Sequence, residues 1–320
     1  MIFEKQVVNG YKGMMHTRYD NVSLSFYFSH KDFDGFQREA YAFKSSMGHT
    51  LQGYLYYYDQ FREDRLIVFD HGLGNGHRAY MKEIEKLCSH GYRVFAYDHT
   101  GCMESGGEST NGLAQSLCDL NDCLATIKAD KRFAGLDISV VGHSWGAFST
   151  LNISALHPEI SHIVAMSGFV SVEEMMKMFF AGPLKGYRKP ILALERSANP
   201  KFSTFNAVES LKNSNVKALL IYSENDQLCR RKHYDILKEG LNDKENIHFL
   251  LVENKGHNPN YTEEAVKLLE VFKKARAKFA KKKNTTKEQR AQFLASFNWH
   301  KMTEQDEAVW QEIFAHLDDK

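Results

Sequence analysis

Several features that would assign a broad class are missing from this 320-residue sequence. No apolar run approaches the roughly 20 residues that a bilayer-spanning helix needs, and the start lacks the basic and apolar regions of a secretory signal. The five cysteines form no CxxC pair, which favours a reduced, cytoplasmic protein. With 41 basic and 40 acidic residues, the net charge argues against a general nucleic-acid binder.

Patterns that would point to a bound metal are missing as well. The 15 histidines include no HxH or HExxH spacing, and we expect neither a metal ion nor a cofactor. The 43% of hydrophobic residues are ample for one large α/β domain with additions, or for two domains.

The sequence does contain a regular alternation of two patterns between residues 36 and 283. Runs rich in β-branched and aromatic residues predict strands at 65–72, 92–98, 137–144, 160–169, 216–226 and 246–257. Helical patterns separate most of them, at 77–90, 111–130, 146–156 and 262–283. Two earlier strands, QREAYAFKSS and TLQGYLYYY, turn at Met47–Gly48. This alternation predicts an α/β fold with a mostly parallel, doubly wound sheet.

The chain divides into parts on the same evidence. We predict an N-terminal extension (1–35), an α/β domain (36–283) with an insertion at 171–213, and a C-terminal helical tail (284–320). In the tail, Thr303 opens a short helix, with Asp306 three residues on as a weak capping box. Apolar tail residues at helical spacing are expected to pack on the domain or to form a homodimer contact: Trp299, Trp310, Ile313, Phe314 and Leu317.

Polar residues stand at the carboxyl ends of predicted strands, where function collects in a parallel sheet. The stretch VVGHSWGAF places Ser144 between two glycines, Asp226 ends a later strand, and His257 follows the last one. A serine hydroxyl needs an adjacent base, histidine has a suitable pKa, and a carboxylate orients the histidine. The order Ser, Asp, His matches the triad of a strand-end serine hydrolase.

Each of these residues also has a plainer interpretation. Ser144 can be a structural turn serine, and Asp226 can cap the following helix, with Glu224 as the acid in its place. Three histidines follow Asp226 within the α/β domain (36–283); one lies in a helical pattern and one in a strand, which leaves His257 as the base.

Two backbone groups are candidates for stabilising an oxyanion. The glycine-rich HGLG loop after the strand at 65–72 can bring an N–H group to the developing charge. We predict the N–H groups of Leu73 and Trp145 as donors. His71 and His143 are candidates for packing, for supporting the site or for substrate binding.

Together these residues resemble the α/β-hydrolase superfamily, most closely the branch of monoacylglycerol lipases, lysophospholipases and serine aminopeptidase-like hydrolases. The matching text is HGLGNGHRAY…LCSHGYRVFAYDHTGCMESGGES, GHSWGA, LLIYSENDQLC and NKGH. The resemblance implies the α/β-hydrolase fold, with the insertion as a short helical cap. It also implies Ser144, Asp226 and His257 as the triad, and Leu73 and Trp145 as the oxyanion donors.

The sequence departs from the pattern of that branch in four places. They are Cys102-Met103, Ala147, Ser223 and Asn258-Pro259. None is a triad residue, but they place the chain outside the well-characterised lipases, so no specific substrate follows from the resemblance.

The insertion carries EEMMKMFF at 173–180, which can line an acyl pocket because methionine adapts to varied apolar ligands. Met175, Met178 and Phe179 are the candidate substrate contacts. The alternative is that they only pack the insertion onto the core. The shortness of the insertion favours small or medium acyl groups.

The run KKARAKFAKKKNTTK (273–287) holds eight Lys or Arg and no acidic residue. We interpret this run as the solvent-exposed C-terminal end of a helix, where the helix dipole favours positive charges. Peripheral contact with an anionic membrane surface is the alternative.

The sequence therefore predicts a serine hydrolase that cleaves small-molecule carboxylic esters through an acyl-enzyme. A peptidase or amidase on the same fold is an alternative, with Glu173, Glu174 or Glu195 as candidates for binding a substrate amine. A non-catalytic binding protein of the hydrolase fold is the other, although such proteins usually lose a triad residue.

Overall fold

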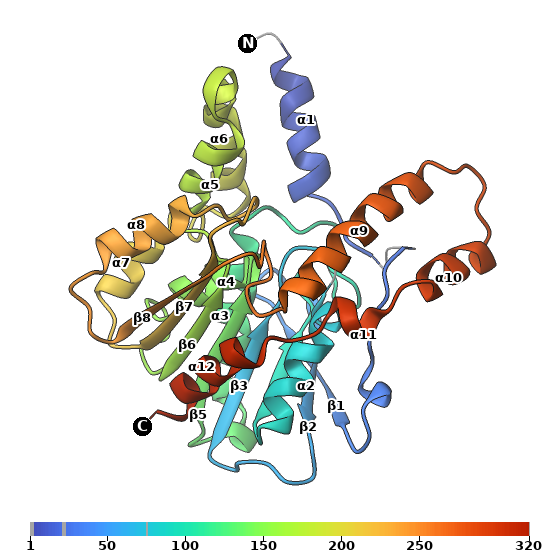
Figure 1. Cartoon of the computed structure of the whole chain (residues 1–320). Coiled ribbons are helices and arrows are strands. Elements are labelled where there is room, and N and C mark those ends of the chain that lie inside the picture. Colours follow the sequence, from blue (N-terminus) through green and yellow to red (C-terminus); the bar gives the residue numbers. More distant parts are fainter. Residues whose placement is uncertain (1–2, 21–23, 75, 320) are drawn as a thin grey trace.

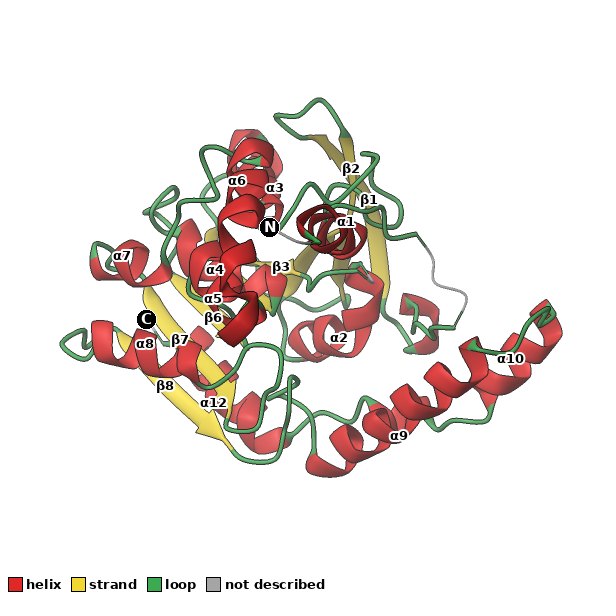
Figure 2. Cartoon of the chain, turned by 90° about the horizontal axis from the view of Figure 1, so that it is seen from above, coloured by secondary structure: helices red, strands yellow, loops and turns green. Residues whose placement is uncertain are grey.

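A computed structural model of the chain describes residues 3–20, 24–74 and 76–319. Its described part contains an eight-stranded sheet with helices on both faces (Figures 1 and 2). The strand order is β1-β2-β4-β3-β5-β6-β7-β8. The pairs β1–β2 and β2–β4 are antiparallel, whereas all pairs among β3 to β8 are parallel. The predicted mostly parallel α/β sheet is therefore confirmed.

The strands match the predicted runs closely. Their bounds are β1 Gln37–Lys44, β2 Thr50–Tyr57, β3 Arg65–Asp70, β4 Arg93–Tyr97, β5 Asp137–His143, β6 His162–Met166, β7 Lys217–Ser223 and β8 Ile247–Val252. The central strands are nearly all apolar because helices cover both of their faces. In β3, for example, Leu66 and Val68 belong to one buried cluster, and Ile67 and Phe69 belong to the other.

Most helices lie between successive strands, whereas α1 precedes the first strand and α9 to α12 follow the last one. Their bounds are α1 Glu4–Met15, α2 Met81–Ser89, α3 Gln115–Ala129, α4 Trp145–Ile153, α5 Val172–Phe179, α6 Arg188–Ala198, α7 Ala207–Lys212, α8 Lys232–Gly240, α9 Glu263–Ala280, α10 Lys287–Ala295, α11 Trp299–Met302 and α12 Glu307–Asp318. Helices α3, α4 and α8 contribute to one buried cluster, whereas α2 and α12 contribute to the other.

Helix α9 corresponds to the pattern at 262–283, which we assigned to the α/β domain as its last helix. It does not cover the sheet but runs outward with α10 (Figures 1 and 2), and α12 of the tail packs on β6 and β7 instead. The apolar face of α12, with Trp310, Ile313 and Leu317, is fully buried there, which confirms the predicted packing on the domain. The helix starts after Asp306, whose carboxylate accepts the amides of Ala308 and Val309. Thr303 was therefore wrong as its start.

The insertion and the N-terminal helix lie together above the carboxyl ends of the strands (Figure 1). Glu195 of α6 is completely buried, and its carboxylate accepts hydrogen bonds from Tyr11 of α1 and from the amide of Leu113, both at 2.8 Å. His16 lies at 2.8 Å from the same carboxylate. A buried carboxylate is costly unless it is paired in this way, so Glu195 fixes α1 against α6.

The structure also shows the state of the cysteines and the length and composition of the helices. All five cysteines are buried and free. Within the part of the chain that the structure describes, no helix has the length and apolar composition needed to cross a bilayer.

A buried histidine between two carboxylates links the ends of β3 and β4 to α3. His99 Nε2 lies 2.8 Å from Asp70, and His99 Nδ1 lies 3.2 Å from Asp119. Burial alone would lower the pKa of His99, but attraction and hydrogen bonding by the two carboxylates raise it to about 9. The folded protein therefore stabilises the imidazolium.

We expect this group to make stability depend on pH. Because the pKa of His99 in the folded state lies above its ordinary value of 6.5, its stabilisation is complete below about pH 6.5. It is lost as the pH rises through about 9, by on the order of 3 kcal/mol. Urea unfolding of the wild type and His99→Gln between pH 6 and 10 measures this loss. Equal losses in both proteins would contradict it.

Candidate active site

Ser144 occupies a sharp turn between β5 and α4. Its φ of 57° and ψ of −112° are strained for a non-glycine residue. The flanking glycines permit this turn: a Cβ on Gly146 would lie 2.1 Å from the carbonyl oxygen of Asp70, and one on Gly142 would lie 2.2 Å from Thr150 Oγ1. The two glycines therefore let strand and helix pack closely around Ser144, as the sequence predicted.

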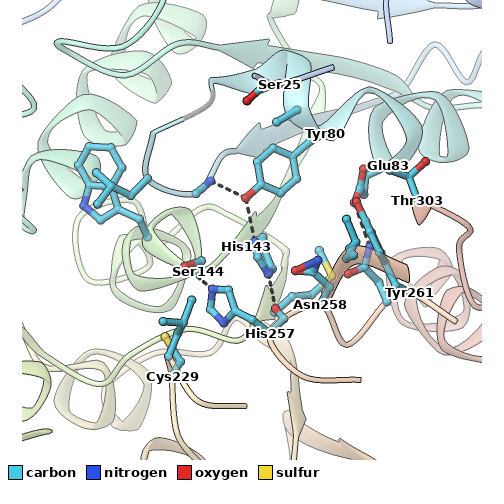
Figure 3. Close-up of a pocket in the computed structure, with 18 of the residues that line it drawn as sticks. Ser25, Tyr80, Glu83, His143, Ser144, Cys229, His257, Asn258, Tyr261 and Thr303 are labelled. Carbon is cyan, nitrogen blue, oxygen red and sulfur yellow. Dashed lines mark hydrogen bonds between the residues drawn. The ribbon is translucent and has the colours of Figure 1, made fainter. Parts of the chain in front are cut away.

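Three predicted residues from separate strand ends meet beside this turn. His257 Nε2 lies 2.8 Å from Ser144 Oγ (Figure 3), and His257 Nδ1 lies 2.8 Å from Asp226 Oδ2. Since the carboxylate can only accept, His257 donates from Nδ1, and Nε2 is left to accept the serine proton. The arrangement can remove that proton when Ser144 attacks an electrophile.

Asp226 is held as a carboxylate by several donors. Its Oδ1 accepts the amides of Leu228 at 2.7 Å and Cys229 at 3.1 Å. Burial alone would raise the pKa of Asp226, but the hydrogen bond and charge of His257, together with these amides, lower it below its ordinary value. Glu224, the alternative acid, instead pairs with Arg231 at 2.7 Å, so Asp226 is the acid that reaches His257.

Hydrogen bonds also join the loop of Asp226 to the loop of His257. Asn225 Oδ1 accepts the amide of Gly256 at 2.8 Å, and Ser223 Oγ accepts the amide of Lys255 at 3.1 Å. The hydroxyl of Ser223 also donates to Asn225 at 2.8 Å. Ser223, one of the departures from the family pattern, thus supports the histidine loop through a contact that glycine cannot make.

Comparison with known proteins agrees with this fold. A family model described as "Serine aminopeptidase, S33" matches residues 62–207. The solved Pyrococcus furiosus esterase Pf2001 superimposes with a TM-score of 0.60 at 20% identity, over 88% of this chain and 99% of that chain. These similarities show that the chain has the α/β-hydrolase fold.

Other similar proteins match a smaller share of this chain. Acetyl xylan esterase 1 from Thermoanaerobacterium sp. JW/SL YS485 matches with a TM-score of 0.55 at 13% identity, over 84% of this chain and 92% of that chain. The Bacillus subtilis (strain 168) protein YqkD is 25% identical over 127 residues, which are 40% of this chain and 41% of that protein. The chain thus spans less than half of this curated relative.

The predicted oxyanion donors lie near Ser144. Trp145 is the first residue of α4, so its amide is among those without a partner inside the helix. Leu73 lies in the HGLG loop, and both residues line the same cavity as Ser144. The indole of Trp145 donates to the carbonyl of Leu113 at 2.6 Å, which fixes the start of the helix.

A second set of hydrogen bonds ties the HGLG loop to His257 (Figure 3). The amide of Gly72 donates to the Tyr80 hydroxyl at 3.1 Å, and this hydroxyl lies 2.8 Å from His143 Nδ1. His143 Nε2 lies 2.7 Å from the carbonyl oxygen of His257. Because that carbonyl can only accept, His143 carries its proton on Nε2 and accepts the Tyr80 proton on Nδ1. Burial and the nearby His257 lower the pKa of His143 to about 3, which keeps it neutral.

Removing the Tyr80 hydroxyl should disturb catalysis rather than substrate capture. Tyr80→Phe leaves the Gly72 amide and His143 Nδ1 without their partner, at a cost of about 1–3 kcal/mol. We expect kcat to fall about tenfold for a simple ester, with a smaller change in KM. Steady-state kinetics measure both. Tyr58→Phe, which removes a hydroxyl bonded to Glu85 at 3.0 Å, is the control, and a kcat equal to wild type in Tyr80→Phe would contradict the prediction.

The serine opens into a cavity of about 520 Å³. Of the predicted substrate contacts, His143, Met175 and Phe179 line it, whereas His71 and Met178 do not. His71 is completely buried; its Nδ1 faces the carbonyl of Gly72 at 2.6 Å, and its Nε2 accepts the amide of His99 at 3.0 Å. His71 was therefore wrong as a substrate contact, because its ring holds the HGLG loop to the next strand end.

The opposite wall of the cavity was not foreseen from the sequence. It is built by the segment at 25–28, by η2 (His77–Tyr80) and α2, and by α9 and α11. Residues of this wall include Phe26, Arg78, Tyr80, Lys82, Glu83, Phe272, Lys273, Arg276 and Trp299. Tyr80 could have been found from the sequence, because it belongs to the HRAY stretch that follows the HGLG loop. The residues of α9 could not, because they reach the cavity only since this helix runs away from the sheet.

The acids proposed for amine binding lie elsewhere. Glu195 is enclosed by α1, and Glu173 and Glu174 pair with Lys177 at 3.1 and 2.7 Å. None of the three is among the described residues that line the cavity. Nor does any group of three His, Cys, Asp or Glu side chains in the described ranges form a candidate metal site.

Proposed function

We propose that this chain is a serine hydrolase that cleaves carboxylic esters through an acyl-enzyme. The observation that carries the proposal is the continuous path from Ser144 through His257 to Asp226, with 2.8 Å at each step. A serine with a purely structural role in the turn would not require a histidine that can accept its proton, or a buried carboxylate that orients this histidine.

The proposed reaction follows from the roles that the geometry allows. Ser144 Oγ attacks the ester carbonyl, and His257 Nε2 takes its proton, while Asp226 stabilises the imidazolium. The amides of Leu73 and Trp145 stabilise the oxyanion, a contribution worth about 2.7–4 kcal/mol per donor in a related case. His257 then protonates the leaving alcohol. Water attacks the acyl-enzyme with His257 again as the base, which releases the acid and restores Ser144.

The ester preference rests on the cavity. Met175 and Phe179 of α5, with Phe169 and Leu228, give apolar contacts beside Ser144 and suit an acyl chain of small or medium length. Two similar solved proteins are named as esterases, which supports the same class of reaction. For an aminopeptidase, the side chains lining the cavity would have to attract a substrate ammonium group, and the three acids considered for this are turned away.

A panel of substrates tests the proposal. We expect 4-nitrophenyl acetate, butyrate, hexanoate and octanoate to be cleaved, with the best kcat/KM among the shorter members. Aminoacyl 4-nitroanilides should be cleaved far more slowly. Ser144→Ala supplies the background for each substrate. Faster Ser144-dependent cleavage of the anilides than of every ester would replace the esterase with a peptidase.

A further inference from the structure

The cavity has two ends of different chemistry. Ser144 and His257 lie on one side, Tyr80 and His143 lie in the middle, and Glu83, Tyr261 and Thr303 lie on the other side (Figure 3). The side chains from the cap beside Ser144 are apolar. The far wall carries four cationic side chains, here called the cationic rim: Arg78, Lys82, Lys273 and Arg276.

The cationic rim has few anionic partners within the chain. Lys273 pairs with Glu270 at 2.7 Å, but among the described residues Arg78, Lys82 and Arg276 form no ion pair. Their charged groups lie over aromatic rings: the guanidinium carbon of Arg78 lies 5.8 Å from the centre of the Tyr27 ring, and that of Arg276 lies 5.6 Å from the centre of the Phe272 ring. Three cationic side chains that form no ion pair within the described ranges thus line the cavity.

Two further observations describe the surroundings of these charges. Burial raises the pKa of Tyr27 and the Asp98 carboxylate adds to the rise, whereas Arg78 and Arg276 act to lower it, so both guanidinium groups act on the same hydroxyl although they come from η2 and α9. Asp98 is itself paired with His77 at 2.7 Å. The only carboxylate among the described residues lining the cavity is Glu83. It is 2% exposed, bonds Asn260 at 3.1 Å, and its pKa is raised by burial, which favours the neutral form.

We propose that the cationic rim binds an anionic group, a carboxylate or a phosphate, that the substrate carries away from its scissile ester. This inference rests on the proposed ester hydrolysis and narrows its substrate class. Convergent cations at the mouth of a partly apolar cavity attract an anion and orient it. Guanidinium groups suit either anion through paired N–H donors. The apolar part of the ester then lies between the rim and Ser144.

Binding can be measured without any catalysis. Calorimetric titration of the full chain at low ionic strength uses hexyl phosphate, 6-hydroxyhexanoate and neutral 1,6-hexanediol. At least one anion should bind about tenfold or more tightly than the diol. The difference should shrink to about twofold in Arg78→Gln/Lys82→Gln/Arg276→Gln, and in half-molar salt. Whether phosphate or carboxylate binds better identifies the preferred anion.

The matched control removes the same net charge from exposed positions in α9 and directly after it. Lys274→Gln/Lys278→Gln/Lys281→Gln changes three exposed lysines that do not line the cavity, and it should keep the preference for the anion. The single variant Arg276→Gln, at an exposed residue, should lose part of the preference if the triple variant does not fold. Equal binding of all three ligands by the wild type, or an equal loss in both triple variants, would overturn the proposal.

A kinetic comparison separates this inference from the function on which it rests. The substrates are 6-acetoxyhexyl phosphate, 6-acetoxyhexanoate and neutral 6-hydroxyhexyl acetate, each with one carboxylic ester, and acid release is followed by titration at constant pH. A higher kcat/KM for an anionic acetate, dependent on Ser144, supports both. Cleavage of all three at equal rates leaves the esterase intact and overturns the anion site. Anion binding without Ser144-dependent cleavage supports the anion site and overturns the esterase.

Discussion

Ester hydrolysis by Ser144→Ala falls about 10⁴- to 10⁶-fold in kcat relative to the wild type. The substitution removes the attacking oxygen and leaves His257 and Asp226 bonded at 2.8 Å. The proposed oxyanion donors and the cavity remain, so a slow residual rate above that in water should persist. Substrate binding should change little. Initial rates with 4-nitrophenyl butyrate, corrected for hydrolysis without enzyme, give the ratio.

The matched control is Ser154→Ala. Ser154 follows the last residue of α4 and is buried, and it does not line the cavity. This variant should retain kcat within about twofold. If Ser144→Ala kept the wild-type rate while remaining folded, the hydrolysis would have to come from another group.

Asp226→Asn lowers kcat by about 10³- to 10⁴-fold with little change in fold. In a serine protease with the same triad, the corresponding change costs about 10⁴-fold through the wrong histidine tautomer. The contacts of Asp226 lead us to expect the same change of tautomer in His257. The amides of Leu228 and Cys229 already donate to Oδ1 of Asp226, so the asparagine oxygen stays with them. Its NH₂ group then faces His257 Nδ1 and forces the proton onto Nε2, which can no longer accept from Ser144.

Glu224→Gln serves as the control for the loss of charge. Glu224 lies two residues away and pairs with Arg231 at the surface, so this variant should keep nearly all activity. The pH dependence of kcat/KM adds a second readout, since the rate of Asp226→Asn should recover in part at high pH as hydroxide replaces the missing base. Similar kinetics for the two variants would contradict the role given to Asp226.

The parts of the fold that follow from local pattern could be predicted from the sequence. The central strands are continuous apolar runs, and the predicted positions of Ser144, Asp226 and His257 follow from the rule that parallel strands end at one edge of the sheet. The structure brings these three side chains within hydrogen-bonding distance. The role of the glycines around Ser144 could also be predicted, because a tight turn between a strand and the next helix leaves no room for a Cβ at these positions.

The far wall of the cavity could not be predicted in this way. Its residues come from an N-terminal segment, from α2 and from a helix that leaves the sheet, and no periodicity tells which of two late helices covers β6 and β7. The pattern in α9 and that in α12 both fit an amphipathic helix, but Trp310 and its neighbours fill the site on the sheet. The buried pairing of Glu195 with α1 depends equally on a contact between distant segments.

Active-site labelling tests the central claim most directly. A fluorophosphonate transfers its phosphonyl group to a serine that a neighbouring base has activated, and mass spectrometry of the digested protein locates the adduct. We predict a single adduct on Ser144 in the wild type, with labelling at least about 10²-fold slower in His257→Gln. An unlabelled Ser144, or equal labelling rates in both proteins, would contradict the account.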